Sequence, residues 1–181
     1  MTRNRILVFV STLLFSIALV SVLHFTVRSV SRTIEPNLSR KLYLATERGE
    51  ITRMRLLIFL GADVNSKVYS QYFCANMTKE DRERDYDFAL QSAALEGQTE
   101  AVELLLNQGA DVNITDGYGR TALWFAALGG KADTARLLIL KGANVNPAKG
   151  ISDYATTPLE IASEHGNQEV IKILLENGAK E

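Results

Sequence analysis

A stretch of this sequence returns almost unchanged further along the chain. Residues 97–113 read GQTEAVELLLNQGADVN, and residues 130–146 read GKADTARLLILKGANVN. Aligned on the opening glycine, the chain contains four copies, which open at Gly49, Gly97, Gly130 and Gly166. The steps between copies are 48, 33 and 36 residues, so a unit of 33 residues recurs with additions of 15 and 3. This recurrence predicts a row of similar structural units.

The part of each copy that follows the opening glycine has the pattern of an amphipathic helix. Positions five, seven, eight and nine after this glycine are apolar in all four copies, and position six is always charged. This spacing fits a helix of about 3.6 residues per turn with one buried side and one side facing solvent. A Gly-Ala pair twelve residues after the opening glycine suits a left-handed helix cap, and the Asp and Asn residues after it suit a tight turn.

A second, shorter helix is predicted before each opening glycine. In the third and fourth copies it begins at Thr121 and Thr157, whose hydroxyl groups can cap a helix, and Pro158 suits the first helical turn. An alanine four residues before the opening glycine recurs in every copy and allows close helix packing. Because one helical hairpin cannot bury its apolar side alone, each unit must pack against the next. The recurrence is therefore a packing requirement.

These units resemble the ankyrin repeat, in which Thr-Pro-Leu-His-x-Ala, a glycine, a Leu-Leu helix and Gly-Ala-Asp-Val-Asn follow one another. The resemblance covers residues 40–181 and implies an all-α solenoid of four helix-turn-helix units. The expected units lie at about 40–65, 87–113, 120–146 and 156–181, with an insertion at 66–86. The residues that replace the family's histidine are Tyr43, Gln91, Trp124 and Glu160. We expect these replacements to weaken some hydrogen bonds within the turns and to leave the helix pairs intact.

The N-terminal part of the chain differs from the repeats. Residues 6–27 carry no formal charge and are flanked by arginines on both sides. As a helix they would span about 33 Å, enough for a hydrocarbon core of about 30 Å. The stretch is longer than the apolar core of a secretory signal, and no small-x-small motif ends it. We therefore expect a short tail at 1–5, a single transmembrane helix at 6–27 and a linker at 28–39, with a cleaved signal as the alternative.

The orientation of this anchor is weakly determined, because arginines and lysines are similarly frequent on its two sides. The short N-terminal tail favours a cytoplasmic N-terminus. The expected setting is then a bacterial inner membrane with the repeats facing the periplasm, in an immunity-like or accessory, chaperone-like role. The alternative is a cytosol-facing scaffold or signalling adaptor with the anchor inverted.

The resemblance also implies that a protein partner meets a concave face, which consists of the turn tips and the inner helices. Mapped onto this chain, the predicted partner contacts are Arg84, Asp85, Asp87, Glu96, Tyr118, Arg120, Trp124, Tyr154, Glu164 and His165. Trp124 could contact the partner or pack between inner helices, and both interpretations stay open. We expect Tyr118 and Arg120 to be free of packing, so that replacing both would weaken binding without changing the melting temperature.

The insertion at 66–86 is the least repeat-like segment of the repeat region. Its first half carries aromatic residues, and its second half alternates acidic and basic residues. It could extend the binding face, as insertions between repeats often do. It could instead cover the first unit, whose outer helix has Phe59 and Leu60 where the other copies are mostly polar. The sequence leaves both open.

Composition argues against catalysis, metal binding and nucleic-acid binding. The chain has a net charge of −1 and no basic stripe, as a nucleic-acid-binding surface would require. One cysteine, Cys74, and two histidines, His24 and His165, provide neither a thiolate cluster nor a nucleophile beside its base. No glycine-rich phosphate loop occurs either. We therefore expect a non-enzymatic module without a cofactor, a metal or a small-molecule substrate.

Overall fold

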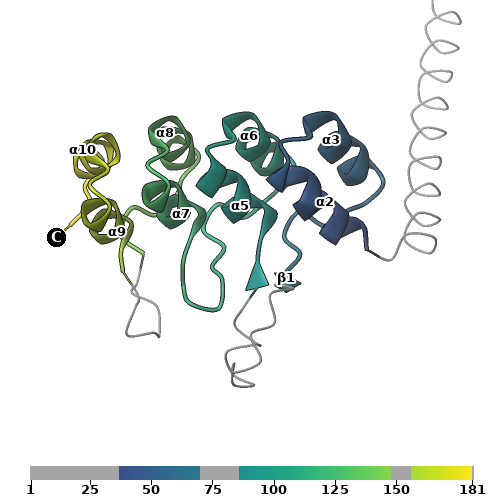
Figure 1. The fold of residues 1–181 in the computed structure, drawn as a ribbon, viewed down its shortest axis with the longest axis horizontal. Coiled ribbons are helices and arrows are strands. Elements are labelled where there is room, and N and C mark those ends of the chain that lie inside the picture. The colour runs from purple at the N-terminus through teal and green to yellow at the C-terminus, as the bar shows by residue number, and fades with distance from the viewer. Residues whose placement is uncertain (1–36, 70–85, 148–155, 181) are drawn as a thin grey trace, which may run out of the picture.

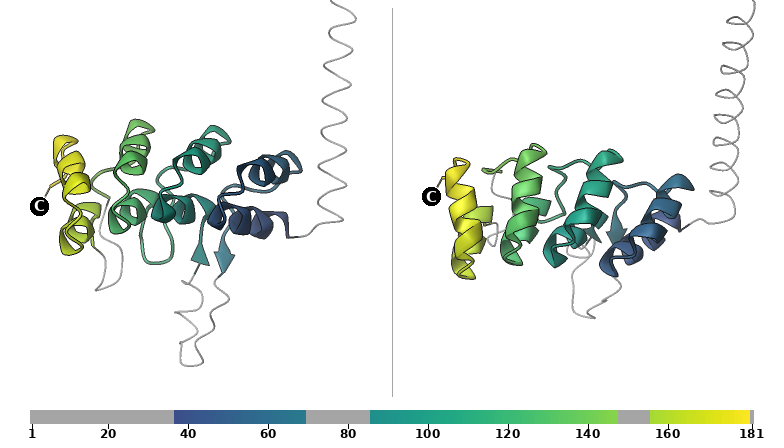
Figure 2. Two further views of the ribbon diagram at one scale, coloured as in Figure 1. Left: turned by 45° about the horizontal axis from the view of Figure 1, so that its top comes forward. Right: turned by 90° about the horizontal axis from the view of Figure 1, so that it is seen from above.

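The helices in the described part of the chain form four hairpins that stand side by side in one row (Figure 1). The computed structural model describes residues 37–69, 86–147 and 156–180. The hairpins are α2 (Leu38–Glu47) with α3 (Ile51–Phe59), α5 (Ala89–Glu96) with α6 (Thr99–Asn107), α7 (Ala122–Leu128) with α8 (Ala132–Leu140), and α9 (Pro158–Glu164) with α10 (Gln168–Glu176). Helices α2, α5, α7 and α9 form an inner layer, and α3, α6, α8 and α10 form an outer layer (Figures 1 and 2). The predicted α-solenoid is confirmed.

A short β-ribbon accompanies the helical hairpins at the edges of the insertion. Strand β1 (Val68–Tyr69) pairs antiparallel with β2 (Tyr86–Asp87), in the register Val68 with Asp87 and Tyr69 with Tyr86. The two strands stand where the chain enters and leaves the insertion, so their pairing closes its base. Val and Tyr favour the pleated strand conformation. This short ribbon at the edges of the insertion leaves the α-solenoid of the four hairpins unchanged.

Several predicted segments lie outside the described residues. These are the tail at 1–5, the anchor at 6–27, most of the linker (28–36) and most of the insertion (70–85). Among the helices that the structure describes, none combines the length and the apolar character needed to cross a membrane.

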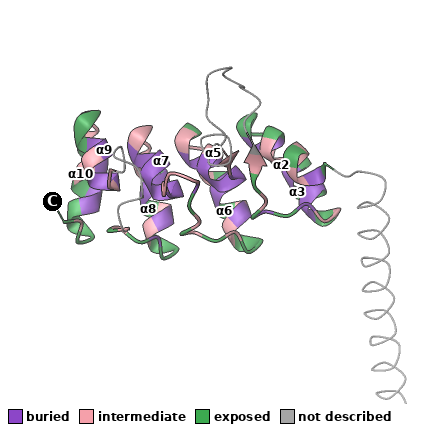
Figure 3. Ribbon diagram, turned by 90° about the horizontal axis from the view of Figure 1, so that it is seen from below, coloured by how far each residue is buried: buried purple, intermediate pink, exposed green. Residues whose placement is uncertain are grey.

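The hydrophobic core runs through all four hairpins as columns of equivalent residues. Position eight after the opening glycine is buried in every unit, with Leu105, Leu138 and Leu174 fully enclosed. The recurring alanines of the inner helices, Ala93 among them, are also buried and allow neighbouring helices to approach. Figure 3 shows this buried surface on the sides of the helices that face one another. The columns predicted from the repeat are therefore the columns that join the units.

The inner helices are capped as the sequence predicts. The hydroxyl oxygen of Thr121 accepts a hydrogen bond from the Trp124 backbone N–H at 3.3 Å. That of Thr157 accepts one from the Glu160 N–H at 3.1 Å, and the Glu160 carboxylate accepts one from the Thr157 N–H at 2.7 Å. Pro158 is the first residue of α9, where its missing N–H costs no helical bond.

Two of the residues that replace the family's histidine make hydrogen bonds at the turns. Glu160 completes the capping box described above. The Gln91 side chain accepts a hydrogen bond from the Phe88 N–H at 3.2 Å and donates one to the Arg120 carbonyl at 2.7 Å. An amide carries a donor and an acceptor, so it can bridge two turns as a histidine would. These two residues therefore supply hydrogen bonds of their own at the starts of their helices.

The asparagine that ends each Gly-Ala-x-Val-Asn motif joins its unit to the next. The Asn113 amide donates to the Gly142 carbonyl at 3.3 Å, and its oxygen accepts from the Asn144 N–H at 2.8 Å. Asn146 repeats the pair with the Gly178 carbonyl and the Lys180 N–H, at 2.8 and 2.9 Å. The same pair of bonds links the first two units through the asparagine at position 65. The residue predicted only to suit a turn therefore also aligns neighbouring units.

The glycines of the repeat provide a test of the contacts between units. Gly130 and Gly109 both have positive φ, at 65° and 87°, where another residue costs about 1–2 kcal/mol. A Cβ at Gly130 would lie 2.8 Å from Asn167 Oδ1, whereas one at Gly109 would meet nothing within 4 Å. The Asn167 amide donates to the Ala127 carbonyl at 2.8 Å and so links the last two hairpins. Gly130→Ala should therefore lower the melting temperature more than Gly109→Ala in thermal unfolding followed by circular dichroism. Equal effects would contradict a stabilising role for the Asn167 contact.

Candidate protein-binding surface

The predicted concave face corresponds to the exposed sides of α2, α5, α7 and α9 together with the loops that precede them. We call this surface the inner-helix face. In Figure 1 the loop before α7 extends from the inner layer, away from the outer helices. Two local features of the inner-helix face differ in their chemistry. The first is Arg120 with the residues that surround it, Asp116, Tyr118, Trp124 and Phe125, which we call the arginine cluster. The second is an acidic groove between the first three hairpins.

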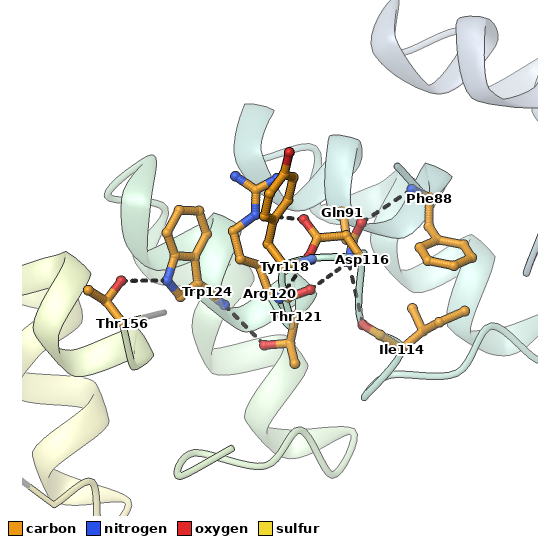
Figure 4. A network of polar contacts seen from close by, with 9 residues as sticks. All are labelled: Phe88, Gln91, Ile114, Asp116, Tyr118, Arg120, Thr121, Trp124 and Thr156. Carbon is orange, nitrogen blue, oxygen red and sulfur yellow. Dashed lines mark hydrogen bonds and ion pairs between the residues drawn. The ribbon is translucent and has the colours of Figure 1, made fainter. Parts of the chain in front are cut away.

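The arginine cluster is built around a buried carboxylate in the loop before α7. The Asp116 side chain is fully buried and accepts hydrogen bonds from the backbone N–H groups of Tyr118 and Arg120, at 2.9 and 2.8 Å. Its second oxygen accepts a bond from Arg120 Nε at 2.6 Å. Figure 4 shows these contacts converging on Asp116. The loop therefore has one defined conformation, which fixes the position of Tyr118 and Arg120.

The Arg120 guanidinium lies among three aromatic rings. Its central carbon is 5.0 Å from the ring centre of Tyr118, 5.2 Å from that of Trp124 and 4.8 Å from that of Phe125. Such cation–π contacts stabilise a partly desolvated guanidinium. Only Nε is hydrogen-bonded to the described residues, and the side chain is 32% exposed. Within the described part of the chain, the two terminal NH₂ groups are thus left to bond an oxygen of a partner.

Trp124 is a packing residue, which decides between the two interpretations that the sequence left open. It is 7% exposed and belongs to the hydrophobic core. Its ring meets that of Phe125 edge to face, with centres 5.1 Å apart, and Nε1 donates to the Thr156 hydroxyl at 3.0 Å. A ring buried to this extent offers little surface to a partner. Trp124 therefore supports Arg120 from the side of the hydrophobic core. The prediction that Trp124 contacts the partner directly does not fit this burial.

A groove of about 190 Å³ opens on the inner-helix face between the first three hairpins. It is lined by Tyr43, Glu47, Asp87, Gln91, Ser92, Leu95, Glu96 and Phe125. Three of these residues carry carboxylates and none is a lysine or an arginine, so the groove is negatively charged. Burial, and then the charges of Asp87 and Glu47, raise the pKa of the Tyr43 hydroxyl.

The structure groups the predicted contacts unevenly. It brings Asp87 and Glu96 together in the groove, and Tyr118 and Arg120 together in the cluster. Glu164 and His165 are exposed at the end of α9, in the last hairpin. Three further predicted contacts, Arg84, Asp85 and Tyr154, lie outside the described residues.

Two important residues were missed by sequence reasoning. Asp116 opens the stretch DGYGR, and an Asp-Gly pair with an arginine four residues after the Asp could have indicated a self-bonded turn. Tyr43 carries no such signal, since only the packing of α2 beside α5 places it in the groove. No group of three or more His, Cys, Asp or Glu residues able to hold a metal ion occurs within the part of the chain that the structure describes.

Comparison with known families agrees with this architecture. Two overlapping stretches, residues 42–149 and 90–181, match the family described as ankyrin repeats (3 copies). A search of curated proteins found no match to the chain. The family matches together extend from residue 42 to residue 181 and include all but the first few described residues. The chain therefore belongs to the ankyrin-repeat family, whose repeats typically act as non-enzymatic modules that bind other proteins.

Proposed function

We propose that the chain is a membrane-tethered module that holds one protein partner against its inner-helix face. The arginine cluster is the observation that carries this proposal, because Arg120 is fixed by a buried carboxylate and its terminal NH₂ groups have no hydrogen-bond acceptor among the described residues. Side chains positioned before binding lose little conformational entropy when a partner arrives. Arginine and tyrosine are also the residue types that contribute most to interface energies.

The acidic groove next to the cluster adds selectivity to this proposal. Phe125 belongs to both features, since it lines the groove and contacts Arg120. A partner that covers the face would therefore meet a negative region and a positive one side by side. Charge patterns of this kind select partners and orient them.

The uncharged stretch at 6–27 supports the membrane tether, and the short tail before it supports a periplasmic repeat domain in a bacterial inner membrane. There the module would mask or stabilise an envelope protein, in an immunity-like or accessory role. A cytosol-facing scaffold is the alternative, and it differs in the compartment of its partner.

Site-specific photo-crosslinking in the native cell tests this proposal. A photoreactive phenylalanine analogue replaces Tyr118 on the inner-helix face in one variant and Glu103, which is exposed on the outer helix α6, in the matched control. We expect the Tyr118 position to give a discrete protein adduct in at least tenfold higher yield than Glu103. Mass spectrometry then assigns the adduct to the envelope or to the cytosol. Equal yields at both positions would overturn the assignment of the binding face.

A further inference from the structure

The two ends of the row differ from its middle, because an end unit has a neighbour on one side only. Position four after the opening glycine is buried in the last three units, as Ala101, Thr134 and Val170. In the first unit the same position is Arg53, whose side chain is 50% exposed. This column therefore faces the preceding unit, and α3 has no such unit among the described residues.

Two further positions of the first unit are also more exposed than their counterparts. Leu56 is 56% exposed, whereas Leu104 and Leu137 are partly buried and Ile173 is buried. Leu44 of α2 is 38% exposed, whereas Ser92 is partly buried and Phe125 and Ile161 are buried. We call the surface formed by Lys41, Leu44, Arg53 and Leu56 the N-terminal end face. A terminal repeat normally needs a polar outer face to stay soluble. This end instead combines exposed leucines with cations.

The charge of the first unit distinguishes this end from the rest of the stack. The basic residues between 37 and 69 are Arg40, Lys41, Arg48, Arg53, Arg55 and Lys67. The acidic residues in the same range are Glu47, Glu50 and Asp63. Glu50 is shared by Arg48 and Arg53, so it neutralises them only in part. Acidic residues outnumber basic ones in the remaining described units. The stack is therefore positive at the end that follows the predicted anchor and negative beyond it.

The length of the linker limits how far this end can lie from the anchor. Residues 28–36 separate the predicted anchor from the first described residue. Even fully extended, these nine residues would reach only about 30 Å. The first unit also stands at one end of the row, opposite α9 and α10 (Figure 2). The N-terminal end face is therefore the part of the stack held nearest to the bilayer.

We infer that the N-terminal end face rests on the anionic lipid surface of the membrane that holds the anchor. This inference depends on the proposed tether. The leucines enter the headgroup region, and Arg53 and its basic neighbours contact lipid phosphates, as polybasic segments beside a membrane do. The row of hairpins then rises from the bilayer, and the inner-helix face points sideways, toward a partner beside it in the same membrane.

Spin labelling of the full chain in vesicles tests the inference. In a Cys74→Ser background, a nitroxide is attached at Leu56→Cys or, as the control, at Leu140→Cys, which is 82% exposed on the outer helix of the third unit. The vesicles contain phosphatidylcholine with or without phosphatidylglycerol. We expect the Leu56 label to collide severalfold more often with oxygen than with a water-soluble nickel complex in the anionic vesicles. The Leu140 label should favour the nickel complex. Arg53→Gln or removal of the anionic lipid should shift the Leu56 label toward the control.

Each other outcome counts against the inference in a recognisable way. Equal collision ratios at both labels would overturn docking while leaving the tether intact. Spin–spin broadening at Leu56 that grows with the protein-to-lipid ratio would indicate contact between two copies instead of contact with lipid. Failure of the protein to float with vesicles after an alkaline wash would overturn the tether, and docking with it.

Discussion

Leu138→Ala should lower the free energy of unfolding by about 2–5 kcal/mol. Leu138 is fully buried in α8, at position eight of the third unit. Its helix contacts α6 on one side and α10 on the other, so the side chain lies in the interior of the row. The surrounding helices are fixed by their own neighbours and cannot close completely over the cavity that alanine would leave. The loss should therefore lie well above that of an average substitution.

Leu140 provides the matched control, because it lies two residues further along the same helix and is 82% exposed. Leu140→Ala should change the free energy of unfolding by no more than about 0.5 kcal/mol. Urea unfolding of the full chain in detergent, followed by far-ultraviolet circular dichroism and by Trp124 fluorescence, measures both. If the two variants were equally stable, the columns of the repeat would not form the core that joins the units.

Asp116→Ala should destabilise the protein by about 3 kcal/mol, because it removes a fully buried carboxylate that accepts three hydrogen bonds, one of them from a charged and partly buried arginine. The loss leaves the backbone N–H groups of Tyr118 and Arg120 without their acceptor, and it leaves Arg120 beside the rings without its counter-charge. Unpaired buried groups of this kind are more costly than the net value of the bonds they made. The loop before α7 should also lose its defined conformation, so the crosslink yield at Tyr118 should fall.

Asp133 provides the control for this substitution. Its side chain is 88% exposed in the first turn of α8, and its pair with Arg136 is open to solvent. Asp133→Ala should cost less than about 1 kcal/mol. Thermal and urea unfolding of both variants measure the difference. Similar losses for the two aspartates would show that Asp116 is not the centre of the loop.

The Asp116 network also corrects one expectation drawn from the sequence. Tyr118 and Arg120 were expected to be free of packing, so that replacing both would leave the melting temperature unchanged. Arg120 instead pairs with a fully buried carboxylate and contacts core rings. Its replacement should lower the melting temperature as well as weaken binding, so Tyr118 is the better position for a binding test. The sequence could not reveal this, because Asp116 and Phe125 approach Arg120 only after the loop folds onto α7.

The fold was largely predictable because its determinants are local and repeated. The caps at Thr121 and Thr157 depend on neighbours three residues away, and the apolar columns depend on helical periodicity. Repetition in four copies separates these signals from chance. The β-ribbon was missed because it joins two strands of two residues each across a long insertion, and no local pattern predicts which segments meet.

The sequence by itself determined that this chain forms helical hairpins and that the hairpins must pack side by side. It could do so because helix periodicity, capping and glycine turns act over a few residues. Only the tertiary structure decided that Trp124 is buried, that Asn113 bonds to the next unit, and that Tyr43 and Glu96 share one groove. These roles depend on contacts between side chains of different hairpins. The position of a residue within its own repeat does not specify which side chains the neighbouring hairpins bring into contact with it.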